Sequence, residues 1–204
     1  MTPTGNGPFT AVTPLVLASG SPRRLEMLTN LGLTFTVQPS ALMEPPPDSG
    51  ELPGDYVLRM AEMKARDVAR SHAGLTVLGA DTIVVLDGRI MGKPESKLNA
   101  LEMLTALSGQ THQVMTGFCL VLPDGSAKSM TVSTDVDMRQ SSEAELMSYI
   151  KTGEPMDKAG AYAIQGIGTF LVTAIRGSYT NVVGLPLARV LETLLAHGIV
   201  DTGE

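Results

Sequence analysis

The pattern of apolar and polar positions near the start of the chain predicts a strand, a loop and a helix. Residues 15–17 form a short apolar run of the kind that a buried strand shows. Small residues follow, and Ser21 and Pro22 then have the character of an N-cap and a first helical position. Gly32 is expected to end this helix, and residues 35–38 predict a second short strand.

Three longer apolar segments predict the body of a sheet. Residues 75–86 are almost continuously apolar, which indicates a central strand covered on both faces. The Asp87-Gly88 dipeptide then predicts a hairpin turn. Residues 113–122 and 130–138 predict two long antiparallel strands around a Pro-Asp-Gly turn.

Helical spacing of apolar residues recurs in the rest of the chain. Further helices are predicted over 55–72, 96–107, 142–150 and 186–197. Asp55 is expected to cap the first of them, and Leu98, Leu101 and Leu104 are expected to face inward from the second. Residues 39–54 are too rich in Pro, Gly and Ser for regular structure, so they predict a loop long enough to be functional.

The order of these elements predicts the fold class. Strands and helices interleave from end to end with hairpins among them, which indicates a mixed α/β fold with a long, curved sheet flanked by helices. No repeat of fixed period is visible, which argues against a solenoid or a propeller. Residues 14–204 are therefore predicted to form a single domain, and residues 1–13 a disordered tail.

Composition narrows the class of protein. With 204 residues, 43% of them hydrophobic, the chain can bury a substantial core. Gly, Asp or Pro interrupts every apolar run before membrane-spanning length, so no membrane partner is expected. The first thirteen residues contain no Lys or Arg, unlike a secretory signal, and the single Cys119 is expected to be a buried thiol. A cytoplasmic location is the resulting expectation.

Charge argues against one large class of partners. The formal net charge is −6, aromatic residues make up 4% of the chain, and there is no Trp. A nucleic-acid-binding protein usually has a basic face and aromatic side chains on which bases stack. No nucleic acid is therefore expected as a partner, although a small phosphorylated ligand needs only a local positive pocket.

The stretch Leu17-Ala-Ser-Gly-Ser-Pro-Arg-Arg24 places two guanidinium groups at a helix N-terminus. Cations are unfavourable there because the helix dipole is positive at that end, whereas free backbone N–H groups and the dipole together suit an anion. Arg23 and Arg24 therefore indicate a bound anion. The alternative is that both are solvated charges on a surface helix.

Three further charged residues occupy unusual positions. Asp81 lies within the apolar run 75–86, where a carboxylate is expensive to bury unless it is paired, hydrogen-bonded or bound to a metal. Lys64 falls on the apolar stripe of its helix, and Lys93 lies in a Gly-Lys-Pro turn. A structural ion pair for Asp81 and a solvent-directed ammonium for Lys64 are the alternatives to a functional site.

Together these charges have the chemistry of a triphosphate site with one hard cation, Mg²⁺ or Mn²⁺. Other chemistries have no signature in the chain. The three histidines stand far apart in sequence, which argues against structural zinc. There is no nucleophile elbow, no phosphate-binding P-loop and no complete G-x-G-x-x-G motif.

Six ordered blocks of sequence carry a resemblance to a known family. They are LASGSPRR, GADTIVVLDG, GKP, SGQTHQVMTG, EPMDKAGAYAIQG and VVGLPL, and they extend from about residue 15 to residue 195. In this order and spacing they resemble the Maf family of nucleotide pyrophosphatases, once named septum-formation inhibitors. The resemblance implies metal-dependent hydrolysis of a nucleoside triphosphate to a nucleoside monophosphate and pyrophosphate. It also implies an elongated fold similar to that of inosine triphosphate pyrophosphatases, with two lobes around a cleft, and a homodimer.

The resemblance also implies roles for individual residues. The implied catalytic residues are Asp81, Lys64, Lys93 and Glu44, and the implied substrate-binding residues are Ser19, Arg23, Arg24, Thr82, Gln165 and Lys158. Asp81 and Glu44 are the implied metal ligands. The family usually has an acidic pair in the loop of Glu44, whereas here Met43-Glu44 precedes three prolines. Lys158 faces the ligand in one interpretation and pairs with Asp157 in the other.

Three positions indicate the subgroup within the family. Members resembling dTTP and UTP pyrophosphatases carry S-P-R-R, A-D-T and I-Q-G, and this chain matches them at Arg23-Arg24, Thr82 and Gln165. A neutral amide at Gln165 can both donate to and accept from a uracil or thymine edge. Modified pyrimidine nucleotides are further possible substrates. The alternatives are the 7-methyl-GTP type of specificity, and a nucleotide-binding regulator of septum formation that acts through a protein partner.

Overall fold

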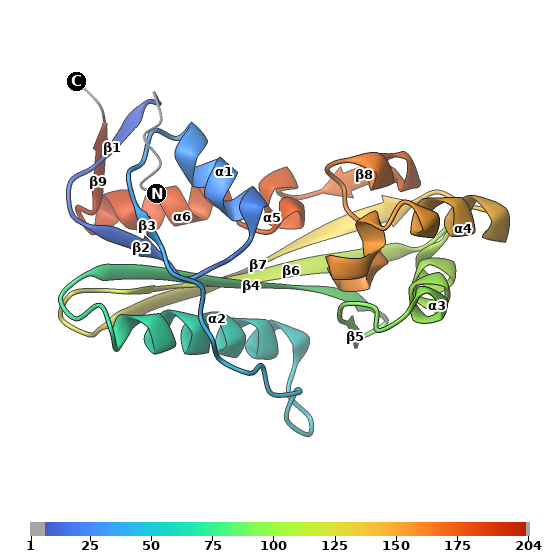
Figure 1. Cartoon of the computed structure of the whole chain (residues 1–204), viewed down its shortest axis with the longest axis horizontal. Coiled ribbons are helices and arrows are strands. Elements are labelled where there is room, and N and C mark those ends of the chain that lie inside the picture. The colour runs from blue at the N-terminus through green and yellow to red at the C-terminus, as the bar shows by residue number, and fades with distance from the viewer. Residues whose placement is uncertain (1–6, 203–204) are drawn as a thin grey trace. The chain divides into compact units, whose positions relative to one another are not determined.

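A computed structural model gives the structure of the protein and describes residues 7–202 (Figure 1). It confirms the mixed α/β class. The strands are β1 (Phe9–Ala11), β2 (Leu15–Leu17), β3 (Thr36–Val37), β4 (Thr76–Leu86), β5 (Arg89–Met91), β6 (Thr111–Val121), β7 (Ala127–Met138), β8 (Val172–Arg176) and β9 (Val200–Thr202). The helices are α1 (Pro22–Asn30), α2 (Pro53–Ala69), α3 (Lys97–Leu107), α4 (Glu143–Lys151), α5 (Tyr179–Val183) and α6 (Leu187–Ala196). The 3-10 helices are η1 (Glu154–Asp157), η2 (Ala159–Ala161) and η3 (Ile167–Leu171).

The strands form a central mixed sheet and a small separate one. In the central sheet the order is β3-β2-β4-β6-β7-β8, and β5 pairs with β4. β2 runs parallel to both β3 and β4, whereas β5 is antiparallel to β4 and β8 is antiparallel to β7. β1 and β9 pair with each other in an antiparallel ribbon.

The described chain divides into two compact units. Unit 1 contains residues 7–81, 116–131 and 184–202, and unit 2 contains Thr82–Met115 and Val132–Val183. β4, β6 and β7 each contribute residues to both units. The cleft and the single domain that the sequence predicts for this chain stay predictions.

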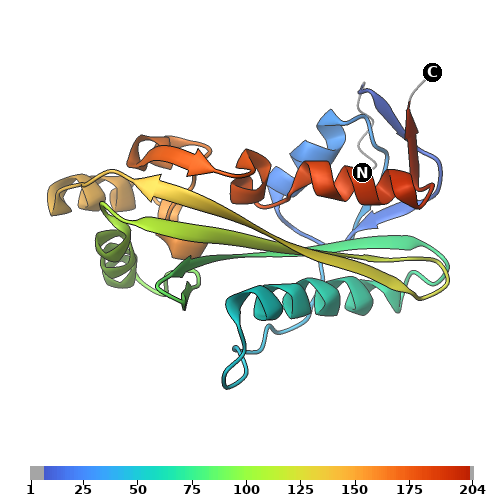
Figure 2. The same cartoon turned by 180° about the vertical axis from the view of Figure 1, so that it is seen from behind.

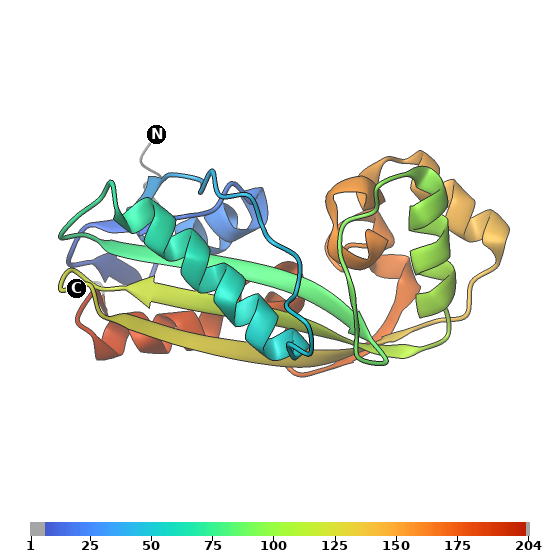
Figure 3. The ribbon, with the colours of Figure 1, turned by 90° about the horizontal axis from the view of Figure 1, so that it is seen from below.

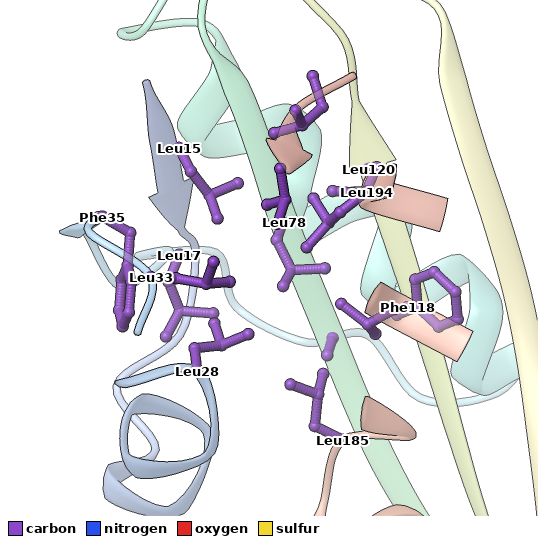
Figure 4. Packing of buried hydrophobic residues seen from close by; sticks show 14 residues of the cluster. Leu15, Leu17, Leu28, Leu33, Phe35, Leu78, Phe118, Leu120, Leu185 and Leu194 are labelled. Carbon is purple, nitrogen blue, oxygen red and sulfur yellow. The ribbon is translucent and has the colours of Figure 1, made fainter. Parts of the chain in front are cut away.

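The sheet of unit 1 is buried on both faces because successive side chains of a strand point to opposite sides. Leu15, Leu17 and Leu78 belong to a cluster with residues of α1 and α6 (Figure 4). Val16 and Val77, at the alternate positions, pack on the opposite face with residues of α2. Figure 2 shows α6 and α2 on these two faces. This double coverage explains why β2 and β4 are nearly continuous apolar runs.

Cys119 lies in the cluster that faces α2 and is fully buried, as predicted. Burial raises the pKa of its thiol. The thiol therefore contributes to packing as a small apolar group.

Helix α2 lies unusually close to the strands of unit 1, which it crosses in Figure 3. A Cβ atom placed on Gly79 of β4 would lie 2.6 Å from the carbonyl oxygen of Ala61 and 2.8 Å from the Cβ of Ala65. A Cβ on Gly117 of β6 would lie 2.6 Å from the carbonyl oxygen of Val57. Helix backbone and sheet therefore meet without an intervening side chain at two points, and this closeness fixes the height of α2 over β4.

Unit 2 has a core of its own, in which residues of β4, β6 and β7 pack against α3, α4 and the segment 154–171. His112 of β6 is 2% exposed, and its Nε2 lies 2.7 Å from the hydroxyl oxygen of Tyr162. The two rings meet edge to face with centroids 5.3 Å apart. Burial lowers the pKa of His112 to about 4, against an opposing effect of Asp137, so the ring is neutral at pH 7.

Several sequence predictions about helix N-termini and one about a hairpin turn can be compared with the structure. Ser21 occupies the N-cap position of α1 with Pro22 at the first helical position, but the Ser21 side chain makes no capping hydrogen bond. Ser142 with Glu145 forms a complete capping box on α4, as their spacing in the sequence predicts, and Ser96, where the second predicted helix begins, caps α3. At the predicted hairpin, Asp87 and Gly88 both have positive φ, as a two-residue turn between β4 and β5 requires.

The prediction of a disordered tail over residues 1–13 is wrong for Phe9–Ala11. These residues form β1, which pairs with β9, and the partner strand was itself not predicted. Residues 9–11 lack the continuous apolar run that marks residues 15–17, so this strand is recognised only through its partner. Residues 1–6 of the predicted tail lie outside the described residues.

Two predictions about helices are also corrected. Helix α2 begins at Pro53, so Asp55 lies in its first turn and is not its N-cap. Leu98 is 67% exposed, whereas Ala100, Leu104 and Leu107 are the buried residues of α3. Leucine spacing alone predicts the wrong buried face of α3, because Ala100 forms part of that face. Within residues 7–202, the helices are all too short or too polar to cross a lipid bilayer.

We expect Gly79→Ala to lower the free energy of unfolding by about 2 kcal/mol, because the added methyl group would overlap the backbone of α2. Urea denaturation measures this change. Gly54→Ala is the matched control, since a Cβ there meets only the Thr131 methyl at 4.0 Å, and we expect no loss of stability. Equal stability of the two variants would contradict the close packing of α2 on β4.

We expect His112 to make folding stability depend on pH. Its pKa is about 4 in the folded protein and about 6.5 when unfolded, so below pH 6.5 the unfolded chain binds the proton more readily. Stability is therefore fully present above pH 6.5 and falls by roughly 3 kcal/mol as the pH drops to 4. Denaturation curves for the wild type and His112→Gln at pH 7.5 and pH 4.5 measure this difference. The same pH dependence in both proteins would contradict it.

Candidate active site

Asp81 lies at the last position of β4 that belongs to unit 1. Side chains alternate along the strand, and Gly79 two positions earlier faces α2, so the Asp81 carboxylate also points toward that helix. The residue is 9% exposed. The sheet therefore presents a buried carboxylate to the helix that carries Lys64.

The ammonium of Lys64 bridges two carboxylates. Its Nζ lies 2.7 Å from Oδ1 of Asp81 and 2.7 Å from Oε1 of Glu44. The Lys64 and Asp81 side chains are 14% and 12% exposed, whereas that of Glu44 is 49% exposed. The structure thus brings together three predicted site residues from α2, β4 and the loop 38–52, and one side of the group is open to solvent.

The loop 38–52 is held on α2 by side chains at helical spacing. Arg59 forms two hydrogen bonds with the Glu51 carboxylate, at 2.7 and 2.6 Å, and they hold the pKa of Glu51 at about 2. The Tyr56 hydroxyl donates to the Pro45 carbonyl oxygen at 3.2 Å. Burial raises the pKa of Tyr56, and the carboxylates of Asp81 and Glu44 add to this effect. These contacts place Glu44 beside the other two charges despite its proline-rich surroundings.

Arg24 makes hydrogen bonds with the protein itself. Its Nε donates to the carbonyl oxygen of Gly184 at 2.7 Å, and its Nη1 donates to Ala80 at 2.8 Å and to the Ser19 hydroxyl at 3.0 Å. Burial lowers the pKa of Arg24, and the Asp81 carboxylate opposes this shift. A guanidinium stays charged under these conditions. Arg24 is therefore an anchor between α1, β4 and the segment before α6, close enough to Asp81 to feel its charge.

Arg23 and Ser19 complete the predicted residues of unit 1. Arg23 is partly exposed at the start of α1, and its charge lowers the pKa of Arg24 after the larger effect of burial. Ser19 is 8% exposed, and its hydroxyl oxygen accepts from the backbone N–H of Ser21 as well as from Arg24. The loop 18–21 is thus ordered by its own side chains at the N-terminus of α1.

The remaining predicted residues belong to unit 2. Thr82 directly follows Asp81 in β4, and Lys93 is exposed in the segment after β5. The carbonyl oxygen of Gly92 accepts from the N–H of Gly160, which fixes the turn that carries Lys93. Gln165 is exposed and lines a pocket of about 360 Å³.

Lys158 forms the ion pair that the sequence left open. Its ammonium contacts the carboxylate of Asp157 and lies 3.4 Å from the carbonyl oxygen of Glu154. Its side chain is 13% exposed. The structure thus gives Lys158 a local partner within unit 2.

Asp81 and Glu44 have the donor chemistry for a hard divalent cation. Both carboxylates contact the Lys64 ammonium, so their negative charges lie close together. Mg²⁺ in proteins binds one or two carboxylates together with water and phosphate oxygens. Between residues 7 and 202, no three His, Cys, Asp or Glu side chains are grouped for metal binding. The pair therefore fits a cation shared with a phosphorylated substrate better than a permanent structural metal.

Sequence reasoning did not identify Tyr56, Arg59 and Glu51 as supports of this site. The signal that could have found them is the spacing of Tyr56, Arg59, Met63 and Asp67, which puts them on one side of α2. Asp67 accepts a hydrogen bond from the Ser40 hydroxyl at 2.6 Å and so holds the start of the same loop. A polar helical face beside a long proline-rich loop indicates that the loop lies on the helix.

Comparisons with known proteins show the family of the chain. The family model described as Maf-like protein matches residues 14–197. The dTTP/UTP pyrophosphatase of Nitratidesulfovibrio vulgaris is 51% identical to the chain, over 97% of this chain and 94% of that protein. The dTTP/UTP pyrophosphatase of Oleidesulfovibrio alaskensis is 50% identical, over 96% of this chain and 90% of that protein.

Among solved structures, a HAM1 protein from Coxiella burnetii superposes with a TM-score of 0.50 at 17% sequence identity. The match covers 91% of this chain and 100% of that chain. At this level of identity the likeness concerns the fold alone, and it supports the predicted α/β class.

We expect Arg24→Lys to lower the free energy of unfolding by about 3 kcal/mol, because a single ammonium cannot replace the guanidinium at three acceptors, two of them carbonyl oxygens. Chemical denaturation measures this loss. Arg189→Lys is the control, since the Arg189 side chain is exposed and pairs with the exposed Glu192, and its replacement should change stability by less than about 0.5 kcal/mol. A loss that small for Arg24→Lys would show that Arg24 is not an anchor.

Proposed function

The chain belongs to the Maf family, and from this membership we propose that it hydrolyses dTTP and UTP to the nucleoside monophosphate and pyrophosphate. Two relatives at about half sequence identity carry the name dTTP/UTP pyrophosphatase. The observation that carries the proposal is the convergence of Glu44 and Asp81 on Lys64 beside the α1 N-terminus. This group combines carboxylates for water and metal with cations for phosphate.

The proposal includes a divalent cation, Mg²⁺ or Mn²⁺, held by Asp81 and Glu44. When bound, such a cation lowers the pKa of a coordinated water and neutralises charge on the phosphates. Lys64 brings the two carboxylates together, and in this proposal its ammonium turns from them toward the phosphates when the cation binds. The half-exposed side chain of Glu44 leaves this side of the group accessible to a substrate.

The residues of the chain have separate parts in the proposed reaction. Asp81 orients the attacking water and accepts its proton, while the water oxygen bonds to the α-phosphorus and the bridging bond to the β-phosphate breaks. Pyrophosphate then leaves with the bridging oxygen. Lys64 and Lys93 stabilise the charge that develops on the phosphates, an effect typically worth about a hundredfold to a thousandfold in rate for each contact.

The other predicted residues bind the substrate. Ser19, Arg23 and Arg24 shape a loop and helix N-terminus that suit a phosphate, with Arg24 acting chiefly as the anchor of this loop. Thr82 and Gln165 recognise the base, and the Gln165 amide pairs with a uracil or thymine edge. Lys158 contributes positive charge in this proposal only if its ion pair with Asp157 opens.

Two further parts of the proposal rest on the family and on composition. A homodimer is implied by the resemblance to the Maf family. The cytoplasm is proposed as the location because the single cysteine is a buried free thiol, so the chain has no internal disulfide.

We expect pyrophosphate release from dTTP and UTP in the presence of Mg²⁺, and much slower release from CTP, GTP and 7-methyl-GTP. Chelation with EDTA should stop it, because the phosphates lose their neutralising cation. Asp81→Asn should lower kcat by about a hundredfold or more with the fold intact. Pyrophosphate detection and circular dichroism measure these outcomes.

Asp87→Asn is the matched control, because it makes the same chemical change at an exposed hairpin turn whose positive φ suits asparagine. Its activity should equal that of the wild type. Near wild-type turnover by Asp81→Asn would contradict the assigned role. Binding of dTTP without any release of pyrophosphate would instead support a regulator that acts through a protein partner.

A further inference from the structure

Tyr149 of α4 and Glu154 of η1 form a polar pair inside unit 2. The Tyr149 hydroxyl donates to Oε2 of Glu154 at 2.7 Å, and Tyr149 is 2% exposed. Burial and the Glu154 carboxylate both raise the pKa of Tyr149, so its hydroxyl keeps its proton. The mechanism proposed above uses neither residue.

This pair holds both ends of the segment that contains Gln165, which we call the Gln165 loop, residues 163–168. On one side of Gln165, the N–H of Ala163 donates to the Tyr149 hydroxyl oxygen at 3.2 Å. On the other side, Ile167 donates to Oε1 of Glu154 at 2.9 Å and Gly168 donates to Oε2 at 2.8 Å. One tyrosine and one carboxylate therefore fix the backbone before and after Gln165.

The loop lies directly against the pair. A Cβ on Gly166 would lie 2.3 Å from Oε1 of Glu154, and a Cβ on Gly168 would lie 2.4 Å from the Tyr149 hydroxyl oxygen. Gly166 also has φ +109°, which other residues rarely adopt. A side chain at either glycine of I-Q-G-I-G would thus collide with Glu154 or Tyr149, which gives these two glycines a structural reason.

A further contact closes the loop around Gln165. The Thr169 hydroxyl lies 2.7 Å from the carbonyl oxygens of both Ile164 and Gly166, the two neighbours of Gln165. The side chain of Gln165 is left exposed beside the pocket of about 360 Å³, which is large enough for a pyrimidine base. A rigid backbone with an exposed amide is the arrangement that precise recognition of a base edge needs.

We infer that Glu154, with Tyr149, is a positioning residue for nucleotide selectivity: it fixes the backbone that presents the Gln165 amide to the base. This inference rests on the proposed function and deepens it, because it explains how the specificity position is held. Glu154 acts through the loop and does not touch the substrate.

The hydrogen-bonding groups of Glu154 and Tyr149 determine which substitutions test this inference. The two carboxylate oxygens of Glu154 face three donors, namely the Tyr149 hydroxyl and two backbone N–H groups. In Glu154→Gln the amide NH₂ must face at least one of these donors, so at least one contact is lost without a change in side-chain size. Tyr149→Phe is a second variant, which keeps the ring packing against Phe170 and removes only the hydroxyl.

The experiment measures kcat and KM for UTP, CTP and GTP, together with hydrogen exchange of the Ile167 and Gly168 amides. We expect Glu154→Gln to reduce the ratio of kcat/KM for UTP over CTP or GTP by about tenfold, mainly through KM for UTP, with kcat changed less than about threefold. Amide exchange at both positions should become faster. Tyr149→Phe should shift the ratio in the same direction.

Two controls separate positioning from a general loss of stability. Glu145→Gln makes the same change on α4, where Glu145 belongs to the capping box and pairs with Arg139, and it should leave the ratio unchanged. In a Gln165→Ala background, Glu154→Gln should produce no further change in the ratio, because the group that it positions is absent.

Each remaining outcome is decisive. An unchanged ratio in Glu154→Gln, or an equal additional loss in the Gln165→Ala background, would overturn the positioning role. Failure of the wild type to release pyrophosphate from UTP or dTTP would refute the proposed function instead. In that case hydrogen exchange still tests the inference. Unchanged exchange of the Ile167 and Gly168 amides in Glu154→Gln would overturn it.

Discussion

The contact between α2 and β4 at Gly79 is the constraint on which the candidate site depends. Because no side chain separates helix from strand there, the Lys64 ammonium reaches the Asp81 carboxylate two residues further along β4. The same helix also carries Tyr56 and Arg59, which hold the loop of Glu44. A single helix therefore sets the positions of two carboxylates and the ammonium between them.

The strand itself is held from two directions at the same point. Arg24 donates to the carbonyl oxygen of Ala80, and Lys64 donates to the side chain of Asp81, the next residue. The sequence presented two arginines at a helix N-terminus as an electrostatic conflict. For Arg24 the conflict is relieved within the protein, since the guanidinium faces three oxygen acceptors and the negative charge of Asp81 lies nearby. A phosphate would add to this arrangement and is not needed to explain Arg24.

Structural features that depend on neighbouring residues of the chain could be predicted from the sequence. The buried run of β4, the capping box of α4 and the Asp87-Gly88 turn each depend on neighbouring residues, and all were predicted. The importance of Asp81 and Lys64 was also inferred, because charge within an apolar pattern requires a partner.

Structural features that depend on contacts between distant segments could not be predicted from the sequence. β1 and β9 exist because they pair with each other, and neither has a periodicity of its own. The supports of Gln165 come from α4 and η1, whose residues give no sign of the loop that they hold. Leu98 was placed inward because leucine spacing alone does not show where Ala100 allows close packing. The roles of Lys93 and Lys158, the predicted substrate contacts of unit 2 that carry positive charge, stay predictions.

The discontinuous path of unit 1 has a consequence for its synthesis. Its core joins Leu15 and Leu78 to Leu185, Leu194 and Val200, which the ribosome adds more than a hundred residues later. Until those late residues emerge, the apolar face of β2 and β4 lacks the α6 cover, and β1 lacks its pairing strand. The nascent chain therefore exposes this apolar surface to solvent until Val200 has been synthesised, and the core of unit 1 closes only after that point.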